Sequence, residues 1–584
     1  MNDNKILMKK YKQYLLPSIL TSLALALNEF VDCMLVSNLL GSDALAIANI
    51  GCPVILLIAA CYVLLGNGGS ILYAICLGRW DKETAGKVFR LSLILSAVGG
   101  ILFFAIGMLF KGTFTEILCA DKELLPTFQS YYHVLLYSAP VLMLTLTFVS
   151  FLPPSGAPVI ATIVNIVANG TNLVMDVVYI KFLKMGVEGA GYATITGYLI
   201  GFIVMLVLMK VRKVRPVSVP LTRRSSAKRK GGVLWLIGRI VAQGAPAAML
   251  QVCFAIKYGF SNGLAVNYGG RDGVVAFSLC LQTFSIASVF LLGVADTAQP
   301  LLAMLYGQKD YKGERTVLKH SFFLQIIFAL GLIAFFEILP QAIAGMYGVN
   351  DPEVLRLGKT GIRLFALTYL PRGIGIQFMR FFQVEQRRIY AFFISLMDGL
   401  LVLPVGYFLC ELAGLNGVFI SYPISAALML LVIVIINARI YMKRPKDYCG
   451  ISLVRKDSGS IANKSFTITD ASEDISNASE QMIDLCSEQG VPRKLAFRVG
   501  LLIEEMAVYT RQHRTDEGDI DITLRLTERE ITINFRSIGT PFDPTTGKEG
   551  DIPENILMLK SMASRISYDY IMGMNSTQIL IERS

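Results

Sequence analysis

The sequence predicts an all-α polytopic membrane protein with twelve transmembrane helices in two parallel six-helix repeats, followed by a cytoplasmic α/β sandwich domain. Of its 584 residues, 54% are hydrophobic and only 17% are charged, whereas soluble domains carry about 25% charged residues. Up to about residue 442, apolar stretches recur with the roughly 20-residue length that a bilayer-spanning helix needs. Beyond that point the sequence turns polar, which indicates an attached soluble domain.

Twelve segments have the length and hydropathy of spanning helices. They are 13–38, 46–76, 90–110, 131–152, 156–180, 188–210, 236–265, 274–304, 319–340, 360–382, 389–411 and 415–441. The chain enters the first of them without a small-residue cleavage site, so we interpret this segment as a retained helix and not as a signal peptide.

The loops between these segments differ in charge from one side to the other. Five loops on one side hold 23 Lys and Arg, and four loops on the opposite side hold eight. The positive-inside rule therefore places both termini in the cytoplasm of a bacterial cell, together with a basic linker that also suits anionic lipid headgroups. The net charge of +11 comes from this membrane part, because residues 464–584 carry 13 basic and 20 acidic side chains. We therefore expect no nucleic-acid partner.

An internal repeat relates the two halves of the membrane part. Pro17 recurs as Pro246, and the turn GRWD (78–81) recurs as GQKD (307–310), both 229 residues later. Six spans per copy is an even number, so both copies enter the bilayer from the same side. Parallel repeats are typical of transporters that bind substrate near the bilayer midplane and alternate access by rocking.

These features divide the chain into five parts. We expect an N-terminal six-helix lobe at 1–210, a basic cytoplasmic linker at 211–235 and a C-terminal six-helix lobe at 236–442. A tether at 443–463 would then lead to the soluble domain at 464–584.

Polar side chains form a stripe on the fifth predicted helix. Asn165, Asn169, Asn172 and Asp176 are spaced by four, three and four residues, so they share one helical face. A carboxylate at membrane depth costs roughly 2.5–3.5 kcal/mol on insertion scales, so such groups face a bundle interior or a watery cavity.

The first and sixth helices add further polar groups. Asp32 and, one turn earlier, Glu29 lie on the first helix, and Thr194 lies on the sixth. Buried carboxylates are candidates for carrying a proton or holding a cation. The alternative is that these groups only join helices through interhelical hydrogen bonds.

The second repeat is less polar at the matching positions. Ser261 and Val405 stand where the first repeat has Asp32 and Asp176, although Asp398 corresponds to Asn169. We therefore expect ion coupling in the first lobe.

The membrane part, about residues 10–442, resembles the MATE (multidrug and toxic compound extrusion) transporters. The matching stretches include LLPSILTSLALALNEFVDCMLVSNLLGSDALAIANIG, TNLVMDVVYI, GVEGAGYATITG and LLGVADTAQPLLAMLYGQKDYKGE. The resemblance implies export of organic cations and other amphipathic molecules in exchange for H⁺ or Na⁺. It also implies an ion site, possible for Na⁺, on Asp32, Asn172, Asp176 and Thr194. The cation-binding glutamate that some members carry in the seventh helix has no counterpart here.

The polar C-terminal part has its own pattern of elements. It predicts helices at 471–489, 493–513 and 553–566, and strands at 519–526, 530–537, 567–572 and 577–582. The two central strands alternate apolar and polar residues, which suggests a half-covered sheet. With helices on one face, such a sheet forms an α/β sandwich.

The order of these elements resembles the ATP-binding domain of histidine kinases and, more closely, anti-sigma-factor serine kinases. LLIEEMAVYTRQH resembles the first nucleotide-binding helix and keeps Glu505, and SIGTPFDP resembles the glycine-containing turn and keeps Gly539. Tyr509 replaces the asparagine of the Mg²⁺–phosphate site, Ser537 replaces the adenine-binding aspartate, and the lid is reduced to PENILMLKS. We expect a degenerate domain that regulates or contacts a cytoplasmic protein and binds ATP and Mg²⁺ poorly.

The sequence thus favours a secondary antiporter with no enzymatic activity and no required cofactor beyond the coupling ion. No GxxxxGK[ST] motif is present, so ATP-driven transport is unsupported. Two alternatives remain open. One is a lipid-linked oligosaccharide flippase of the same superfamily, and the other is a membrane-anchored signalling protein that acts through its C-terminal domain.

Overall fold

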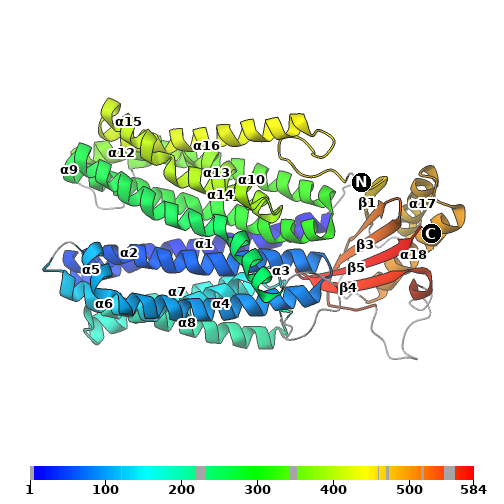
Figure 1. Ribbon diagram of the computed structural model, residues 1–584, viewed down its shortest axis with the longest axis horizontal. Coiled ribbons are helices and arrows are strands. Elements are labelled where there is room, and N and C mark those ends of the chain that lie inside the picture. The colour runs from blue at the N-terminus through cyan, green and yellow to red at the C-terminus, as the bar shows by residue number, and fades with distance from the viewer. Residues whose placement is uncertain are drawn as a thin grey trace.

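The computed structural model describes residues 5–119, 122–214, 216–217, 232–341, 352–457, 459–468, 472–513, 518–544 and 559–583. Two helical bundles lie side by side, and a small β-sheet with two helices lies at one end of both (Figure 1). We call the bundles the N-lobe (α1 to α8) and the C-lobe (α9 to α16), and we call the unit that begins at β1 the sheet domain.

The N-lobe helices follow the predicted apolar segments. Its elements are α1 (Lys5–Leu40), α2 (Ser42–Tyr62), η1 (Val63–Asn67), α3 (Gly68–Gly78), α4 (Lys82–Leu109), α5 (Lys111–Leu118), α6 (Leu125–Ser150), α7 (Pro158–Asp176), η2 (Val177–Phe182) and α8 (Gly186–Val211). The two π-helical turns, η1 and η2, directly continue α2 and α7. Such turns inside long helices frequently occur at functional sites.

The C-lobe begins with one very long helical run. Its elements are α9 (Val233–Gln308), α10 (Tyr311–Ile338), α12 (Pro352–Ala366), α13 (Tyr369–Val384), α14 (Arg388–Leu400), α15 (Val402–Ala413) and α16 (Leu415–Lys443). Gly270 breaks α9 into two helices with φ 56° and ψ −144°, a conformation that glycine adopts without steric cost. A single glycine therefore makes the turn between the predicted spans 236–265 and 274–304.

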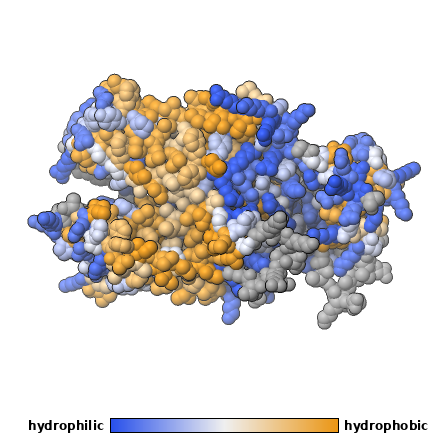
Figure 2. Space-filling model, in the orientation of Figure 1, coloured by the Kyte–Doolittle hydropathy of each residue, from blue (hydrophilic) through white to orange (hydrophobic). Residues whose placement is uncertain are grey.

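Long apolar helices dominate both lobes. In the described part of the chain, nine segments are long and apolar enough to cross a membrane. They are Ile47–Gly78, Lys82–Leu109, Leu125–Ser150, Pro158–Phe182, Gly186–Val211, Val233–Gln308, Tyr311–Ile338, Arg388–Ala413 and Leu415–Lys443. Figure 2 shows a broad hydrophobic band across the visible face of both lobes and a hydrophilic surface toward the sheet domain. The chain is therefore a multi-pass membrane protein, while the number of twelve crossings stays a prediction.

The two lobes pack tightly at the end that carries the sheet domain. Gly78 of α3 and Gly307 of α9 lie against each other, and a Cβ atom on either would collide with the opposite helix backbone. A second close approach joins Gly68 and Gly244. At the other end the lobes separate, and Figure 2 shows a notch between them. We call the packed end the closed end.

The sheet domain contains five antiparallel strands in the order β1-β2-β3-β5-β4. They are β1 (Ala462–Ile468), β2 (Ile520–Leu526), β3 (Glu530–Ile538), β4 (Arg565–Ile571) and β5 (Met574–Glu582). Helices α17 (Ser472–Glu488) and α18 (Arg493–His513) pack on the apolar sheet face, which includes Ile522, Leu524, Ile533 and Phe535.

The structure corrects three expectations for the C-terminal part. Strand β1 was not predicted, and it begins inside the expected tether. The helix expected at 553–566 is wrong at its end, because β4 already starts at Arg565 and pairs with β5; residues 551–558 lie outside the described residues. The expected tether at 443–463 is partly packed against the lobes, since Leu453 and Val454 are fully buried in a core shared with them.

The prediction of a half-covered sheet, with one face exposed to water, is also wrong. On the polar face of β2 and β3, Asp521, Thr523, Asn534 and Arg536 are at most 6% exposed. Helices α17 and α18 cover the apolar face of the sheet, and the closed end of the two lobes lies against the polar face, as the contacts of α1 with β2 and β3 indicate.

We predict that Gly307→Val destabilises the protein, because the added side chain would have to displace the backbone of α3. Overpacking of this kind costs on the order of 1–3 kcal/mol, so the melting temperature of the detergent-solubilised protein should fall. Gly331→Val is the matched control, since Gly331 lies in α10 with open space around its Cβ position. Equal melting temperatures for the two variants would contradict this account of the closed end.

Candidate functional site

The stripe predicted on the fifth helix lies on α7 and faces the interior of the N-lobe. Asn165, Asn169, Asn172 and Asp176 are each at most 6% exposed, and Asp176 is fully buried. Helix α7 packs chiefly against α8 and α1, which carry Thr194 and Asp32. The fold thus brings the predicted polar groups of three helices into one region.

Asp32 and Asp176 face each other inside this region. The two carboxyl groups are close enough to interact through hydrogen bonding and electrostatically. Apart from this contact, both oxygens of Asp176 and one oxygen of Asp32 have no hydrogen-bond partner in the described part of the structure. Asp176 is also the last residue of α7 before the π-helical turn η2.

The amide of Asn172 lies next to this pair. Its Nδ2 donates to Thr194 Oγ1 at 3.2 Å, and the Thr194 hydroxyl donates to the carbonyl of Ala190 at 3.1 Å. This chain of bonds fixes the amide orientation and leaves Asn172 Oδ1 without a hydrogen-bond partner among the described residues.

The remaining predicted residues take different roles. Asn165 turns back onto its own helix and donates to the carbonyl of Ala161 at 2.9 Å. Asn169 is buried, and its Nδ2 has no hydrogen-bond partner within the described ranges. The side chain of Glu29 lies outside the described residues.

The chemistry of this cluster suits a small cation. Two facing carboxyl groups in an apolar surrounding cannot both be charged unless a cation lies between them; otherwise one of them holds a proton. The unpartnered oxygens of Asp32, Asp176 and Asn172, with the hydroxyl of Thr194, form an all-oxygen donor set of the kind that hard cations prefer. The residues present therefore fit either H⁺ or Na⁺.

The C-lobe contains a second buried cluster with the opposite balance of charge. Asp398 of α14 pairs with Arg372 of α13 at 3.1 Å and with Lys257 of α9 at 3.5 Å, and all three side chains are at most 7% exposed. The Lys257 ammonium also donates to the main-chain carbonyl of Asp398 at 3.0 Å. Asp398 therefore lies beside two built-in cations.

Lys257 and Arg372 were not among the residues predicted from the sequence, where only acids were considered in the second lobe. The signal was present, because basic residues inside apolar spans are as expensive as acidic ones. A third missed residue is Arg380, which pairs with Asp296 at 2.8 Å. This pair acts electrostatically on Tyr62 of the N-lobe, so it lies close to the boundary between the lobes.

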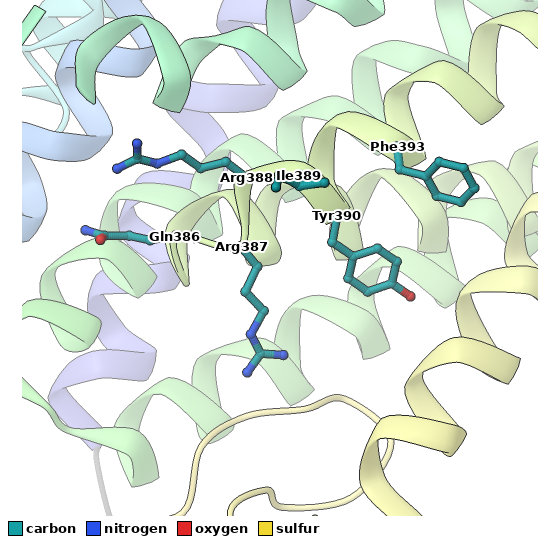
Figure 3. A pocket seen from close by; sticks show the side chains of 6 residues that line it. All are labelled: Gln386, Arg387, Arg388, Ile389, Tyr390 and Phe393. Atoms are coloured by element: carbon teal, nitrogen blue, oxygen red, sulfur yellow. The ribbon is translucent and has the colours of Figure 1, made fainter. Parts of the chain in front are cut away.

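A shallow cavity of about 620 Å³ lies at the turn between α13 and α14 (Figure 3). Its lining residues are Gln386, Arg387, Arg388, Ile389, Tyr390 and Phe393. The two arginine side chains point in different directions, and each has a protein partner. Arg387 donates to the carbonyl of Leu453 at 3.1 Å, and Arg388 donates to Gln243 Oε1 at 3.1 Å. These contacts make the cavity a structural junction.

Glu385, the residue before this cavity, is almost fully buried. Burial raises the pKa of its carboxyl group, although Arg387 and Arg455 lie beside it and oppose the shift. Arg455 comes from the expected tether and donates to Glu385 Oε2 at 2.9 Å.

The residues that the sequence assigned to a degenerate nucleotide site lie among aromatic side chains. Tyr509 is 7% exposed and stacks edge-on against Phe542. Ser537 is buried in β3, and the Gly539 carbonyl accepts a bond from Tyr570 at 3.2 Å. Glu505 is half-buried on α18. The expected lid lies largely outside the described residues.

Comparison with protein families gives a direct assignment. The MatE family model matches residues 17–178 and 246–408, which correspond to the two repeats. The chain belongs to the MatE family. Both halves match the same model, so the internal repeat inferred from Gly78 and Gly307 is a property of this MATE chain.

Relatives of this MATE chain are named as drug exporters. It is 23% identical over 428 residues to the probable multidrug resistance protein YoeA of Bacillus subtilis, covering 72% of this chain and 91% of the relative. It is 22% identical to the multidrug export protein MepA of a Staphylococcus aureus strain, covering 75% and 94%. These MATE relatives are transporters, so the chain is a transporter and not an enzyme.

Solved structures share the MATE fold of this chain. An outward-facing multidrug resistance MATE transporter of the MOP superfamily superposes with a TM-score of 0.68 at 22% identity, covering 74% of this chain and 94% of that one. A MOP superfamily transporter from Pyrococcus furiosus superposes with a TM-score of 0.67 at 22% identity and the same coverage.

We predict that Asp398→Asn strongly destabilises this MATE protein, because Lys257 and Arg372 would keep their charges in the bundle and lose their counter-charge. Breaking a buried pair in this way costs about 3–5 kcal/mol. Glu353→Gln is the control, because the Glu353–Arg356 pair is exposed on both sides and such pairs contribute about 0–1 kcal/mol. Unfolding in detergent monitors both variants, and a similarly small effect of each would contradict a structural role for the cluster.

Proposed function

We propose that the chain is a secondary antiporter that exports drugs or amphipathic, often cationic, metabolites in exchange for H⁺ or Na⁺ by alternating access. The observation that carries the proposal is the pair of facing, otherwise unpartnered carboxyl groups of Asp32 and Asp176. The names of the relatives, which are multidrug resistance and export proteins, support the substrate class.

In this proposal the N-lobe holds the coupling ion. Asp32 and Asp176 bind one H⁺ or Na⁺ between them, and Asn172, oriented by Thr194, offers its free amide oxygen to the same cation. Loss of the ion leaves two like charges facing each other in an apolar bundle, which is costly. The site must therefore rearrange or reload, and this requirement couples ion passage to the conformation of the lobe.

We place the protein in the bacterial cytoplasmic membrane with twelve crossings and with both termini in the cytoplasm. The basic loops 78–90 and 306–319, which lie at the closed end, support this orientation through the positive-inside rule. The closed end would then face the cytoplasm and the notch the outside. The sheet domain, which lies at the closed end, would then be cytoplasmic. We assign it a regulatory role and not nucleotide binding, because the ring of Tyr509 packs against Phe542 where the resemblance expects a ligand of Mg²⁺.

We predict that Asp32→Asn and Asp176→Asn each abolish gradient-driven export and leave the fold intact, because an amide keeps the size of the carboxyl but cannot exchange H⁺ or balance Na⁺. The measurement is dye uptake into inverted vesicles with an imposed pH or Na⁺ gradient, using a panel of cationic dyes. The driving gradient that supports uptake also identifies the coupling ion.

Asn165→Ala is the matched control on the same helical stripe, since Asn165 bonds only within its own helix in the described structure. Its export should stay within about twofold of the unmodified protein, the scale expected when a single weak local bond is lost. Normal export by both aspartate variants would refute the proposed coupling site.

A further inference from the structure

The sheet domain lies on the closed end, where it contacts both lobes (Figure 1). Its contacts are made by the polar face of the sheet and by the turn between β4 and β5. Nothing in the transport reaction proposed above requires this domain, so its position calls for a separate explanation.

The contact with the C-lobe is centred on Arg536 of β3. This side chain is 2% exposed and donates to Asp310 Oδ2 at 2.7 Å and to Gln308 Oε1 at 2.6 Å. Asp310 also caps α10, because its other oxygen accepts from the backbone of Gly313 at 2.9 Å. Arg536 therefore bonds to two residues of the GQKD turn, directly beside Gly307 and its crossing with Gly78.

The contact with the N-lobe uses the repeat-equivalent turn. Lys82 follows Asp81 of the GRWD turn, and it pairs with Asp569 of β4 at 3.2 Å and donates to the carbonyl of Tyr568 at 3.3 Å. Asp81 caps α4 just as Asp310 caps α10. One sheet thus holds the two symmetry-related turns that flank the Gly78–Gly307 crossing.

The turn between β4 and β5 provides a third contact. Met572 and Gly573 both have positive φ angles, as a two-residue hairpin turn requires. Met572 is fully buried, and its carbonyl accepts from Tyr14 of α1 at 3.2 Å. Gly573 lies so close to Gly156 that a Cβ atom on Gly156 would collide with its backbone. The hairpin is therefore wedged between α1 and the loop before α7.

We propose that the sheet domain is an autoinhibitory clamp that holds the two lobes together at the closed end. Opening of this end separates the GRWD and GQKD turns, and one rigid sheet cannot stay bonded to both when they part. The domain must therefore release at least one lobe in each transport cycle. The consequence for transport rests on the antiporter function proposed above, but the clamp itself does not.

The charged part of the interface fits a contact that breaks and re-forms. Arg536, Asp310, Lys82 and Asp569 are charged groups that water can solvate after release, while Ile571, Met572 and Met574 of the hairpin form a small apolar part. Interfaces between domains of one chain are more polar than obligate interfaces. The chain also stays anchored next to the C-lobe through the bond between Arg455 and Glu385. A released domain therefore remains at high local concentration and can dock again.

The test uses the full-length protein in liposomes and the native Cys76 as a reporter. Cys76 lies in α3, is 4% exposed, and belongs to the core of the closed end. Its rate of reaction with a maleimide, resolved by mass spectrometry, reports opening of this end without any substrate, because a buried thiol reacts only when exposed. Cys280, fully buried in the C-lobe bundle, reports general unfolding.

Arg536→Met should accelerate labelling of Cys76 about tenfold or more, because it removes two charge-assisted bonds of the clamp. Labelling of Cys280 should not change. Arg498→Gln is the control, since Arg498 lies on α18, which packs on the opposite face of the sheet, and donates to the carbonyl of Ser561 at 3.4 Å. It should leave Cys76 labelling within about twofold, the effect of losing a single exposed local bond.

Lys82→Gln provides a second test that does not depend on the folding of Arg536→Met, because the Lys82 side chain is half exposed. It should also accelerate labelling of Cys76 alone. Unchanged Cys76 labelling in Lys82→Gln together with unchanged or non-selective labelling in Arg536→Met would overturn the clamp. Faster Cys76 labelling without dye transport in any variant would instead refute the antiporter function and leave the clamp standing.

Discussion

The close contact between Gly78 and Gly307 is the constraint on which the rest of this structure depends. The two residues are equivalent positions of the internal repeat, so the pseudo-twofold axis that relates the lobes passes between them. Without side chains at these positions, α3 and α9 approach until their backbones touch, and this contact closes one end of the molecule. Gly68 and Gly244 make a second close approach at the same interface, and the lobes diverge toward the other end, where the notch lies. The tight packing of the closed end therefore rests on glycines at two crossings.

The repeat preserves this architecture but not the chemistry inside each lobe. In the N-lobe, Asp32 and Asp176 face each other and can be neutralised only by something that comes from outside. In the C-lobe, Lys257 and Arg372 neutralise Asp398 permanently. An exchangeable ion is useful only where no built-in counter-charge exists. In the antiport that we propose, this asymmetry would let a symmetric fold couple ions in one lobe and use the other as a stable partner.

The features that sequence reasoning predicted well are those whose cause is local or periodic. The α7 stripe followed from a 3.6-residue spacing of expensive side chains, and the lobes followed from a constant offset between matching turns. Glu29 and Asn165 entered the predicted site by the same logic, but Asn165 satisfies itself on its own helix. Lys257 and Arg372 were missed because their counter-charge, Asp398, is more than 25 residues away from each. Long-range pairing of this kind leaves no periodic signal.

For β2 and β3, the alternation of apolar and polar residues predicted the strands correctly but predicted the wrong surroundings for their polar face. Alternation of apolar and polar residues normally means that one face meets water, yet Asp521 and Arg536 are buried against the transporter. The alternating pattern is consistent with both the exposed and the buried arrangement of this face if the face is exposed to water for part of the time. An apolar docking face would bind permanently and would be prone to aggregation once released, whereas a polar face remains soluble after release. The alternation in DIDITLRL and ITINFRS therefore suits the proposed clamp, because the same polar surface would face water whenever the sheet domain is released.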